Sequence, residues 1–345
     1  MLREKSEDPK KYRLKCAVWE FTLACNLRCS HCGSSAGKER ESELNTEECF
    51  NLCEQLADLG CENVCLMGGE PFLREDWYFV GQTISDLGMH LSIASNGLLV
   101  KKNIEKISQL EPLVIGISID GIEQMHDTIR GKGTFGACIE AIELLREKGI
   151  GVTVITTVSK LNFKDLPKMK DLIYKKGINW QIQIAMPFGN FAPSYLLSKE
   201  EYYAVAMFIA SARVKSKFSD MPVIGAHCFG YNSMFLPGCS SWNGCTAGIS
   251  SIGITSDGGI VGCLSMGNQR FIEGNIRNEK LKGIWYSDSF KYNRGFEKGK
   301  LGPNCMECRY GTKCKGGCNS MSYTITNSFH NDPYCFYKIE KEMGI

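Results

Sequence analysis

Short apolar runs alternate with helical patterns between residue 14 and about residue 216. Six of the runs have the length and the β-branched or aromatic content of strands, and turn or cap residues bound them. They occupy residues 14–22, 63–67, 90–94, 113–119, 151–158 and 180–185. Strands that alternate with helices predict a parallel sheet and therefore an α/β fold.

Helical periodicity fills the intervals between these strands. The clearest helix lies between the fourth and fifth strands and ends before Gly149, because its apolar residues recur at three- and four-residue spacing. These residues are Phe135, Cys138, Ile139, Ile142 and Leu145. Further helices are expected at about 45–60, 164–176 and 199–217. Six βα units are too few for an eight-unit barrel, so the sequence predicts a partial (β/α)6 barrel.

The pattern changes near residue 218. Residues 225–335 are rich in Gly and Cys and lack regular βα alternation, and residues 252–263 predict a β-hairpin around the Asp257-Gly258 turn. Few large apolar residues occur here, so metal sites are the better candidates to stabilise this part of the chain. We therefore expect two domains, a barrel at 14–217 and a small Cys-rich domain at 218–345.

Composition narrows the class of protein. The 345 residues are 43% hydrophobic and 23% charged, which is ordinary for a soluble globular protein. A net charge of +2 indicates no nucleic-acid partner, and no apolar run approaches the roughly 18 residues of a membrane span. Residues 1–10 are charged and do not resemble a signal peptide. We therefore expect a cytoplasmic protein whose eighteen cysteines serve metal ligation rather than disulfides.

Three cysteines follow the first strand with the spacing C-x3-C-x2-C. Cys25, Cys29 and Cys32 supply one thiolate fewer than a fully ligated 4Fe–4S cluster takes, so one iron would stay open. An open metal position is where substrate or cofactor binds in catalytic sites. A zinc site, or thiols that merely pack in the core, would have the same spacing, and this run alone leaves those alternatives open.

Polar and glycine-rich segments follow the next strands. Met67-Gly68-Gly69-Glu70-Pro71 ends the second strand, where glycines let the backbone approach a ligand closely. Ligands in parallel α/β folds bind at these carboxyl ends of the strands. A tight turn and simple helix caps are the alternative explanation. The polar residues at the later strand ends are Ser95, Asn96, Ser118, Asp120, Thr156 and Thr157.

The cysteine run and the Gly-Gly-Glu-Pro segment together resemble the radical S-adenosylmethionine (SAM) superfamily. The resemblance implies a partial βα barrel in which the open iron chelates the amino and carboxylate groups of SAM. His31 would lie next to the adenine, in a position usually held by an aromatic residue. The methionine ammonium would be held by Gly68, Gly69, Glu70 and Pro71. The later strand ends would approach the ribose and the carboxylate of SAM. Arg130 would face that carboxylate, which a guanidinium can pair in bidentate fashion.

Nine further cysteines lie in the C-terminal part, and without Cys228 they number eight, as two complete 4Fe–4S clusters require. Two zinc-ribbon sites would also need eight. The order C-x2-C-x5-C-x3-C followed by a distant Cys resembles the SPASM extension of radical SAM peptide-modifying enzymes. The resemblance assigns one auxiliary cluster to Cys239, Cys245, Cys263 and Cys318, and a second to Cys305, Cys308, Cys314 and Cys335. Three 4Fe–4S clusters and SAM are therefore the expected cofactors.

The resemblance implies reductive cleavage of SAM to a 5′-deoxyadenosyl radical that abstracts a substrate hydrogen. The run around Cys25 is similar to that of the pyrroloquinoline quinone and mycofactocin peptide maturases. It therefore favours a ribosomally made peptide substrate, modified by a crosslink, thioether, epimerisation or decarboxylation. A haem- or tetrapyrrole-modifying enzyme is the alternative, and a non-catalytic iron–sulfur electron carrier is a third possibility. The expected partners are the peptide, a separate leader-recognition protein, and a flavodoxin- or ferredoxin-type electron donor.

Seven cysteines and one loop lie outside these motifs. Cys228 lies in a loop-like stretch and is a candidate hydrogen-donor thiol, whereas the other six spare cysteines are expected to be small buried apolar residues. The segment 186–198 leaves the last strand as a loop. Its Phe188, Phe191 and Tyr195 would form a wall of the substrate groove, or would pack the barrel against the C-terminal domain. The six spare cysteines are Cys16, Cys49, Cys53, Cys61, Cys65 and Cys138.

Overall fold

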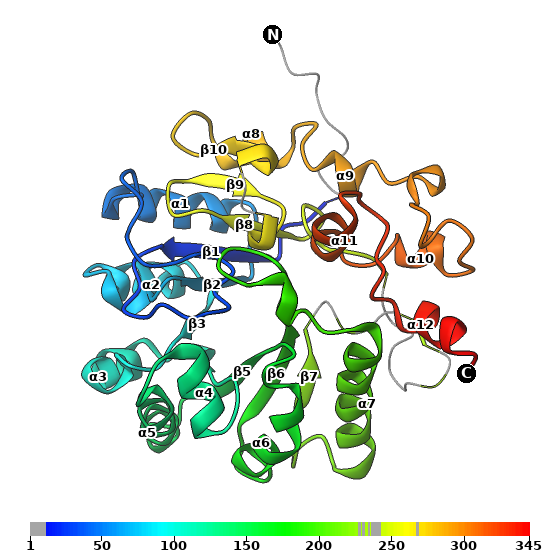
Figure 1. The fold of residues 1–345 in the computed structure, drawn as a ribbon. Helices are drawn as coiled ribbons and strands as arrows, with labels where there is room; N and C mark the ends of the chain where they lie inside the picture. Colours follow the sequence, from blue (N-terminus) through cyan, green and yellow to red (C-terminus); the bar gives the residue numbers. More distant parts are fainter. Residues whose placement is uncertain (1–11, 227–228, 230–231, 234, 236–242, 267–268) are drawn as a thin grey trace.

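Parallel strands form the centre of the computed structural model, and helices cover their outer side (Figure 1). The structure describes residues 12–345 except 227–228, 230–231, 234, 236–242 and 267–268. The parallel strands are β1 (Cys16–Thr22), β2 (Asn63–Gly68), β3 (His90–Ser95), β4 (Val114–Ser118), β5 (Val152–Val158), β6 (Asn179–Ile184) and β7 (Val223–Gly225). The six predicted strands correspond to β1–β6, with ends that differ by two residues at most. The predicted fold class is confirmed, and β7 is an addition to it.

A helix or a pair of helices connects each strand to the next. The helices are α1 (Thr46–Asp58), α2 (Trp77–Asp86), α3 (Val100–Leu110), α4 (Glu123–Arg130), α5 (Thr134–Glu147), α6 (Leu166–Ile173) and α7 (Lys199–Lys215). Capping boxes start α1 at Asn45 and α7 at Ser198. The helix predicted at 164–176 is shorter than expected, because Pro167 occupies its first turn and Lys175 has a left-handed φ of 55°.

The central sheet stays open as a partial barrel. Its order is β10-β9-β8-β1-β2-β3-β4-β5-β6-β7, so β1 pairs with β8 (Ser251–Ile254) instead of meeting β7. The predicted hairpin is confirmed, because β8 pairs antiparallel with β9 (Gly259–Val261). Its parallel pairing with β1, in the register Cys16↔Ser251, was not expected. Strand β10 (Gly274–Asn275) ends this side of the sheet.

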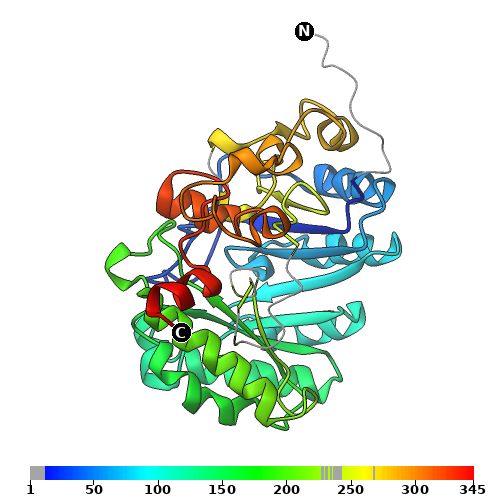
Figure 2. The same cartoon turned by 90° about the vertical axis from the view of Figure 1, so that its right-hand side faces the viewer.

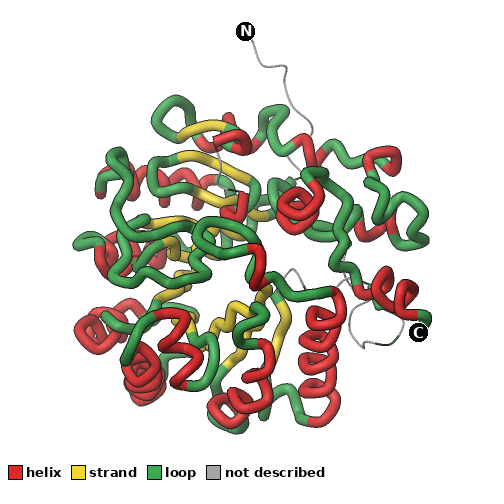
Figure 3. Tube along the Cα trace, in the orientation of Figure 1, coloured by secondary structure: helices red, strands yellow, loops and turns green. Residues whose placement is uncertain are grey.

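The rest of the C-terminal part consists of loops and short helices (Figure 3). The helices are α8 (Leu281–Trp285), α9 (Lys291–Arg294), α10 (Gly311–Cys314), α11 (Asn319–Thr326) and α12 (Phe336–Met343). Helix α12 lies beside α7 in both ribbon views (Figures 1 and 2). The Phe336 ring stacks on Tyr202 there at 5.1 Å between centroids. No helix in the described part of the chain is long and apolar enough to cross a bilayer.

The buried carboxylate of Glu20 connects the two parts of the chain. Glu20 on β1 is 6% exposed and accepts hydrogen bonds from Arg40 (2.9 Å) and from the Ser256 backbone N–H (3.2 Å). The Ser256 hydroxyl adds another bond at 3.0 Å. Because the sheet and the hydrogen bonds from Ser256 to Glu20 join both parts, the described C-terminal hairpin packs as part of the barrel. The domain boundary near residue 218 stays a prediction.

Gly69 has a steric role that substitution can test. A Cβ at this position would lie 2.0 Å from the Ala24 carbonyl oxygen, whereas a Cβ at Gly136 within α5 would meet nothing within 4 Å. We expect Gly69→Ala to destabilise the protein by at least about 2 kcal/mol, because the backbone must move. Gly136→Ala should stabilise it by about 0.5–1 kcal/mol. Urea unfolding under anaerobic conditions measures both, and equal midpoints for the two variants would contradict the argument.

Candidate functional site

The three N-terminal thiols lie on a loop that leaves β1 and closes on itself. The Gly37 N–H donates to the Leu23 carbonyl (2.8 Å), and the Cys25 N–H donates to the Gly37 carbonyl (3.1 Å). Cys25, Cys29 and Cys32 are each half-buried. Burial raises the pKa of Cys25 and of Cys29, and the Cys32 thiol adds to both shifts. The Cys32 N–H donates to the Cys29 carbonyl (3.2 Å), which keeps this part of the loop tight.

N–H groups point at these sulfur atoms. The backbone N–H of Leu27 lies 3.4 Å from Cys25 Sγ, and that of Ala36 lies 3.3 Å from Cys32 Sγ. Arg130 Nη1 lies 3.9 Å from Cys29 Sγ. Hydrogen bonds to sulfur stabilise thiolates and cluster sulfides, so this loop fits an iron–sulfur cluster with three protein ligands.

The Gly-Gly-Glu-Pro segment packs directly on that loop. The N–H groups of Gly69 and Glu70 donate to the carbonyls of Thr22 (2.7 Å) and Ala24 (2.8 Å). Glu70 also caps a 3₁₀ turn that begins at Pro71, where its carboxylate accepts from the Phe72 N–H. The glycines therefore serve the close contact between two strand ends, which a side chain would prevent.

The Glu70 carboxylate is fully buried. It accepts hydrogen bonds from the Ser95 hydroxyl (2.9 Å) and the Asn96 N–H (2.8 Å), which ties the ends of β2 and β3 together. Burial raises the pKa of Glu70 to about 7, although these hydrogen bonds act in the opposite direction. A cation bound beside Glu70 would favour its ionised form, because opposite charges lower a carboxyl pKa.

Asp120 is the charged centre of the next strand end. Its fully buried carboxylate accepts from His31 Nε2 (2.7 Å), from Arg130 Nε, and from the Thr157 N–H (2.8 Å). Burial alone would raise the pKa of Asp120, but the Arg130 guanidinium and His31 outweigh it and hold the pKa well below its usual range. One carboxylate therefore joins the cysteine loop, α4 and β5.

Two residues that the motifs did not reveal support this centre. The Asn162 side-chain amide donates to the carbonyls of Asp120 (2.8 Å) and Thr157 (2.9 Å). The Asp120 N–H donates to Nδ1 of the buried His126 (3.2 Å). Asn162 follows the fifth strand closely, so the polar residues at strand ends extend further along the chain than we predicted.

The structure brings most of the predicted SAM-site residues to one end of the sheet. Seven of them are connected by the hydrogen bonds given above or lie beside the cysteine loop. They are His31, Glu70, Ser95, Asn96, Asp120, Arg130 and Thr157. Ser118 differs, because its carbonyl accepts from the buried Cys138 thiol (3.6 Å) and its half-buried hydroxyl makes no hydrogen bond among the described residues. Their contacts with SAM stay predictions.

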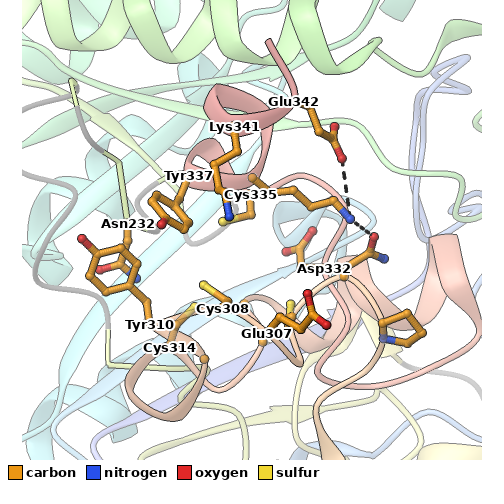
Figure 4. A pocket seen from close by; sticks show the side chains of 17 residues that line it. Asn232, Glu307, Cys308, Tyr310, Cys314, Asp332, Cys335, Tyr337, Lys341 and Glu342 are labelled. Carbon is orange, nitrogen blue, oxygen red and sulfur yellow. Dashed lines mark hydrogen bonds and ion pairs between the residues drawn. The ribbon is translucent and has the colours of Figure 1, made fainter. Parts of the chain in front are cut away.

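Four C-terminal thiols line a cavity of about 260 Å³ (Figure 4). They are Cys305, Cys308, Cys314 and Cys335, the set assigned to the second auxiliary cluster. Among the described residues, no three His, Cys, Asp or Glu side chains are grouped so as to hold one metal ion. Four cysteines around one cavity supply the four thiolates that a 4Fe–4S cluster or a zinc ion takes.

Three of the four thiols assigned to the first auxiliary cluster lie in the described part of the chain. Cys245, Cys263 and Cys318 are half-buried, and their partial burial raises the pKa of all three. Cys245 and Cys263 each add to the rise at Cys318. Cys239, the proposed fourth ligand, and the candidate thiol Cys228 lie outside the described residues.

The remaining cysteines are placed mostly as predicted for small apolar residues. Cys49, Cys53, Cys61 and Cys138 are buried, whereas Cys16 and Cys65 are half-buried. Burial raises the pKa of Cys138 to about 12, so the thiol stays neutral near the SAM-site residues.

The loop at 186–198 lies against the cysteine loop. The Asn190 N–H donates to the Cys32 carbonyl (2.9 Å), and Gly189 packs on the same carbonyl. Phe191 is only 4% exposed, so it packs inside the protein and does not line a groove. Phe188 packs partly buried against the core, and Tyr195 is 42% exposed. The loop thus borders the candidate site, but of its three aromatic residues only Tyr195 is well exposed.

Comparison with known families agrees with this geometry. The profile of the radical SAM superfamily matches residues 19–173, and that of an iron–sulfur cluster-binding domain, SPASM, matches residues 245–309. Residues 19–173 therefore form a radical SAM domain, and residues 245–309 form a SPASM domain. Both domains imply 4Fe–4S clusters, and the first implies SAM binding.

Two kinds of curated relatives match most of the radical SAM chain. An AdoMet-dependent heme synthase of Methanosarcina barkeri is 28% identical over 94% of this chain and 97% of its own length. The mycofactocin maturase MftC of Mycolicibacterium smegmatis is 26% identical over 89% of this chain and 79% of its own length.

Solved structures share the fold. Streptococcus suis SuiB bound to its precursor peptide SuiA superposes with a TM-score of 0.76 at 16% identity, covering 95% of this chain and 77% of SuiB. The enzyme anSMEcpe with bound AdoMet gives a TM-score of 0.72 at 19% identity, covering 96% of this chain and 98% of anSMEcpe.

Substitution of Asp120 tests the hydrogen-bonded centre of the site. We expect Asp120→Asn to destabilise the protein by about 3–5 kcal/mol, because it leaves the buried Arg130 charge unpaired. Asp288→Asn, which removes an exposed ion pair with Lys291, should cost less than about 1 kcal/mol. Urea unfolding compares the two variants.

The contact between Asp120 and Arg130 also makes the stability of the protein depend on pH. A depressed pKa means that Asp120 contributes stability above its unfolded-state pKa of roughly 4 and loses it as the pH falls toward the folded-state value. Asp120→Asn should therefore flatten the acid side of the stability curve. If Asp120→Asn and Asp288→Asn have the same free energy of unfolding and lose it equally at acid pH, Asp120 is not the centre of the site.

Proposed function

We propose that this radical SAM protein is a peptide maturase that holds three 4Fe–4S clusters. When bound at Cys25, Cys29 and Cys32, the cluster with SAM supplies a 5′-deoxyadenosyl radical that abstracts a substrate hydrogen. The observation that carries the proposal is that the loop of Cys25, Cys29 and Cys32 lies beside the buried Glu70 and Asp120 at the carboxyl ends of the strands.

In this proposal the residues of the chain bind and orient SAM. Glu70 offers a buried negative charge where the Gly-Gly-Glu-Pro segment meets the cysteine loop, which suits the methionine ammonium. Arg130 uses Nε for Asp120, and its Nη1 points toward Cys29. That end of the guanidinium is then placed to pair the methionine carboxylate.

The inner face of the sheet favours a peptide over a porphyrin. None of the residues of β1–β7, all of which the structure describes, is Lys or Arg. On β6 the apolar residues face the helices, so Gln181 and Gln183 face the other way, and the Gln183 amide donates to the Thr157 hydroxyl (3.0 Å). Amides and hydroxyls suit a peptide backbone, whereas the carboxylates of a porphyrin call for cations.

The relatives add support from their own substrates. SuiB was solved with the precursor peptide SuiA, and anSMEcpe with a Cp18Cys peptide. MftC is named as a maturase. A ribosomally made peptide, presented by a separate recognition protein, and a flavodoxin- or ferredoxin-type electron donor complete the proposal.

Haem or tetrapyrrole modification is the second candidate. The observation in its favour is that the heme synthase of Methanosarcina barkeri aligns over 97% of its own length, more than MftC does.

Iron content and SAM cleavage test the cluster assignments. We expect Cys25→Ala/Cys29→Ala/Cys32→Ala to lose 5′-deoxyadenosine formation and to keep about eight of about twelve irons, because two four-iron clusters remain. Cys16→Ala, which changes a half-buried thiol outside the motifs, should keep all twelve. Persistent SAM cleavage in the triple variant would refute the first assignment. Zinc in place of the remaining iron, after anaerobic preparation, would refute the other two.

Substrate class needs a direct assay. The protein, SAM and a reductant are incubated with the peptide encoded nearest to its gene, or in parallel with an iron porphyrin. We expect 5′-deoxyadenosine together with a peptide that has changed in mass or carries deuterium at one centre in heavy water. If the peptide stays unchanged while the porphyrin accelerates SAM cleavage and is itself converted, the haem candidate is correct and the peptide proposal is wrong.

A further inference from the structure

The hydroxyl of Tyr292 is buried beside Cys263, one of the thiols assigned to the first auxiliary cluster. Tyr292 lies on the short helix α9, and its hydroxyl oxygen is buried without a hydrogen-bond partner among the described residues. A buried hydroxyl that makes no hydrogen bond costs about 1–3 kcal/mol, so such a group usually has a partner.

Close packing fixes the position of this hydroxyl. A Cβ at Gly262 would lie 1.8 Å from the Tyr292 oxygen, so the hydroxyl rests on the backbone immediately before Cys263. The Tyr292 ring stacks on Phe329 at 4.8 Å between centroids and 16° between planes. The phenol therefore has little freedom to turn toward another partner.

The neighbouring residue, Asn293, connects the same helix to the two chain segments that carry Cys245 and Cys318. The Asn293 side-chain amide donates to the Cys245 carbonyl (2.9 Å). Its oxygen accepts from the side chain of Asn319, the residue after Cys318 (3.2 Å). A tyrosine phenol is protonated at neutral pH, so Tyr292 can donate a hydrogen bond from its place on the backbone beside Cys263.

We infer that Tyr292 donates its phenolic hydrogen bond to a sulfur atom of the first auxiliary cluster and so raises the reduction potential of that cluster. The inference rests on the proposed cluster assignment. One-electron reduction makes the cluster more negative, and a donor to its sulfur stabilises that extra charge. Tyr292 is thus a tuning residue that sets how readily this cluster accepts an electron.

Tyr292→Phe removes only the hydroxyl and tests the inference. We expect the first auxiliary cluster to become harder to reduce by about tenfold in the equilibrium constant, which is about 59 mV for a one-electron couple. A redox titration followed by electron paramagnetic resonance measures this shift in the loaded protein. Electron–nuclear double resonance of the reduced cluster should show one exchangeable proton in the wild type that the variant lacks.

Tyr323→Phe is the matched control. Tyr323 belongs to the same aromatic group as Phe329, but its hydroxyl accepts from Arg270 (2.6 Å) and is not aimed at the cluster. This variant should leave the potential and the proton signal unchanged.

Three outcomes are distinct. An iron content too low for a first auxiliary cluster in the wild type would refute the cluster assignment itself. A loaded cluster whose potential and proton signal are the same in Tyr292→Phe would overturn the role of Tyr292. If the variant does not load the cluster, the wild-type spectrum decides, because the absence of a coupled exchangeable proton there overturns the inference.

Discussion

The arrangement of the candidate site depends on the buried carboxylate of Asp120. Its three donors come from the cysteine loop, from α4 and from the end of β5, segments that are distant in sequence. A buried charge is tolerated only when it is paired and hydrogen-bonded, so each of these segments has one low-energy position. A radical reaction benefits from that rigidity, because a misplaced substrate carbon leaves the radical to react elsewhere.

Most of the barrel could be predicted because its signals are local. The apolar runs of β1–β6 and the glycines after β2 show in a few adjacent residues. The parallel pairing of β8 with β1 could not be predicted, because no local pattern records which distant strand covers an exposed edge. Strand β7 was missed for a related reason, since three residues are too few to show an alternation.

The site was predictable in its residue types but less so in its connections. The motifs named His31, Asp120 and Arg130 separately, as SAM contacts, and did not reveal that they bind one another. Asn162 was not predicted as a site residue, because a single amide in a loop resembles an ordinary helix cap. Phe191 was predicted either to form a groove wall or to pack the barrel against the C-terminal domain, and it is buried, because the loop that carries it folds back on the cysteine loop.

The pairing of β1 with β8 also bears on the order in which the chain folds. The ribosome makes β1 more than 230 residues before its neighbour at Ser251–Ile254. Until then one edge of β1 exposes unpaired backbone groups, which favours association with other nascent chains. The paired strands β1 and β8 are also far apart in the sequence, so their contact forms slowly compared with the contacts within the βα units. Chaperones and cluster-loading factors would therefore meet this protein with its first strand still open on one side.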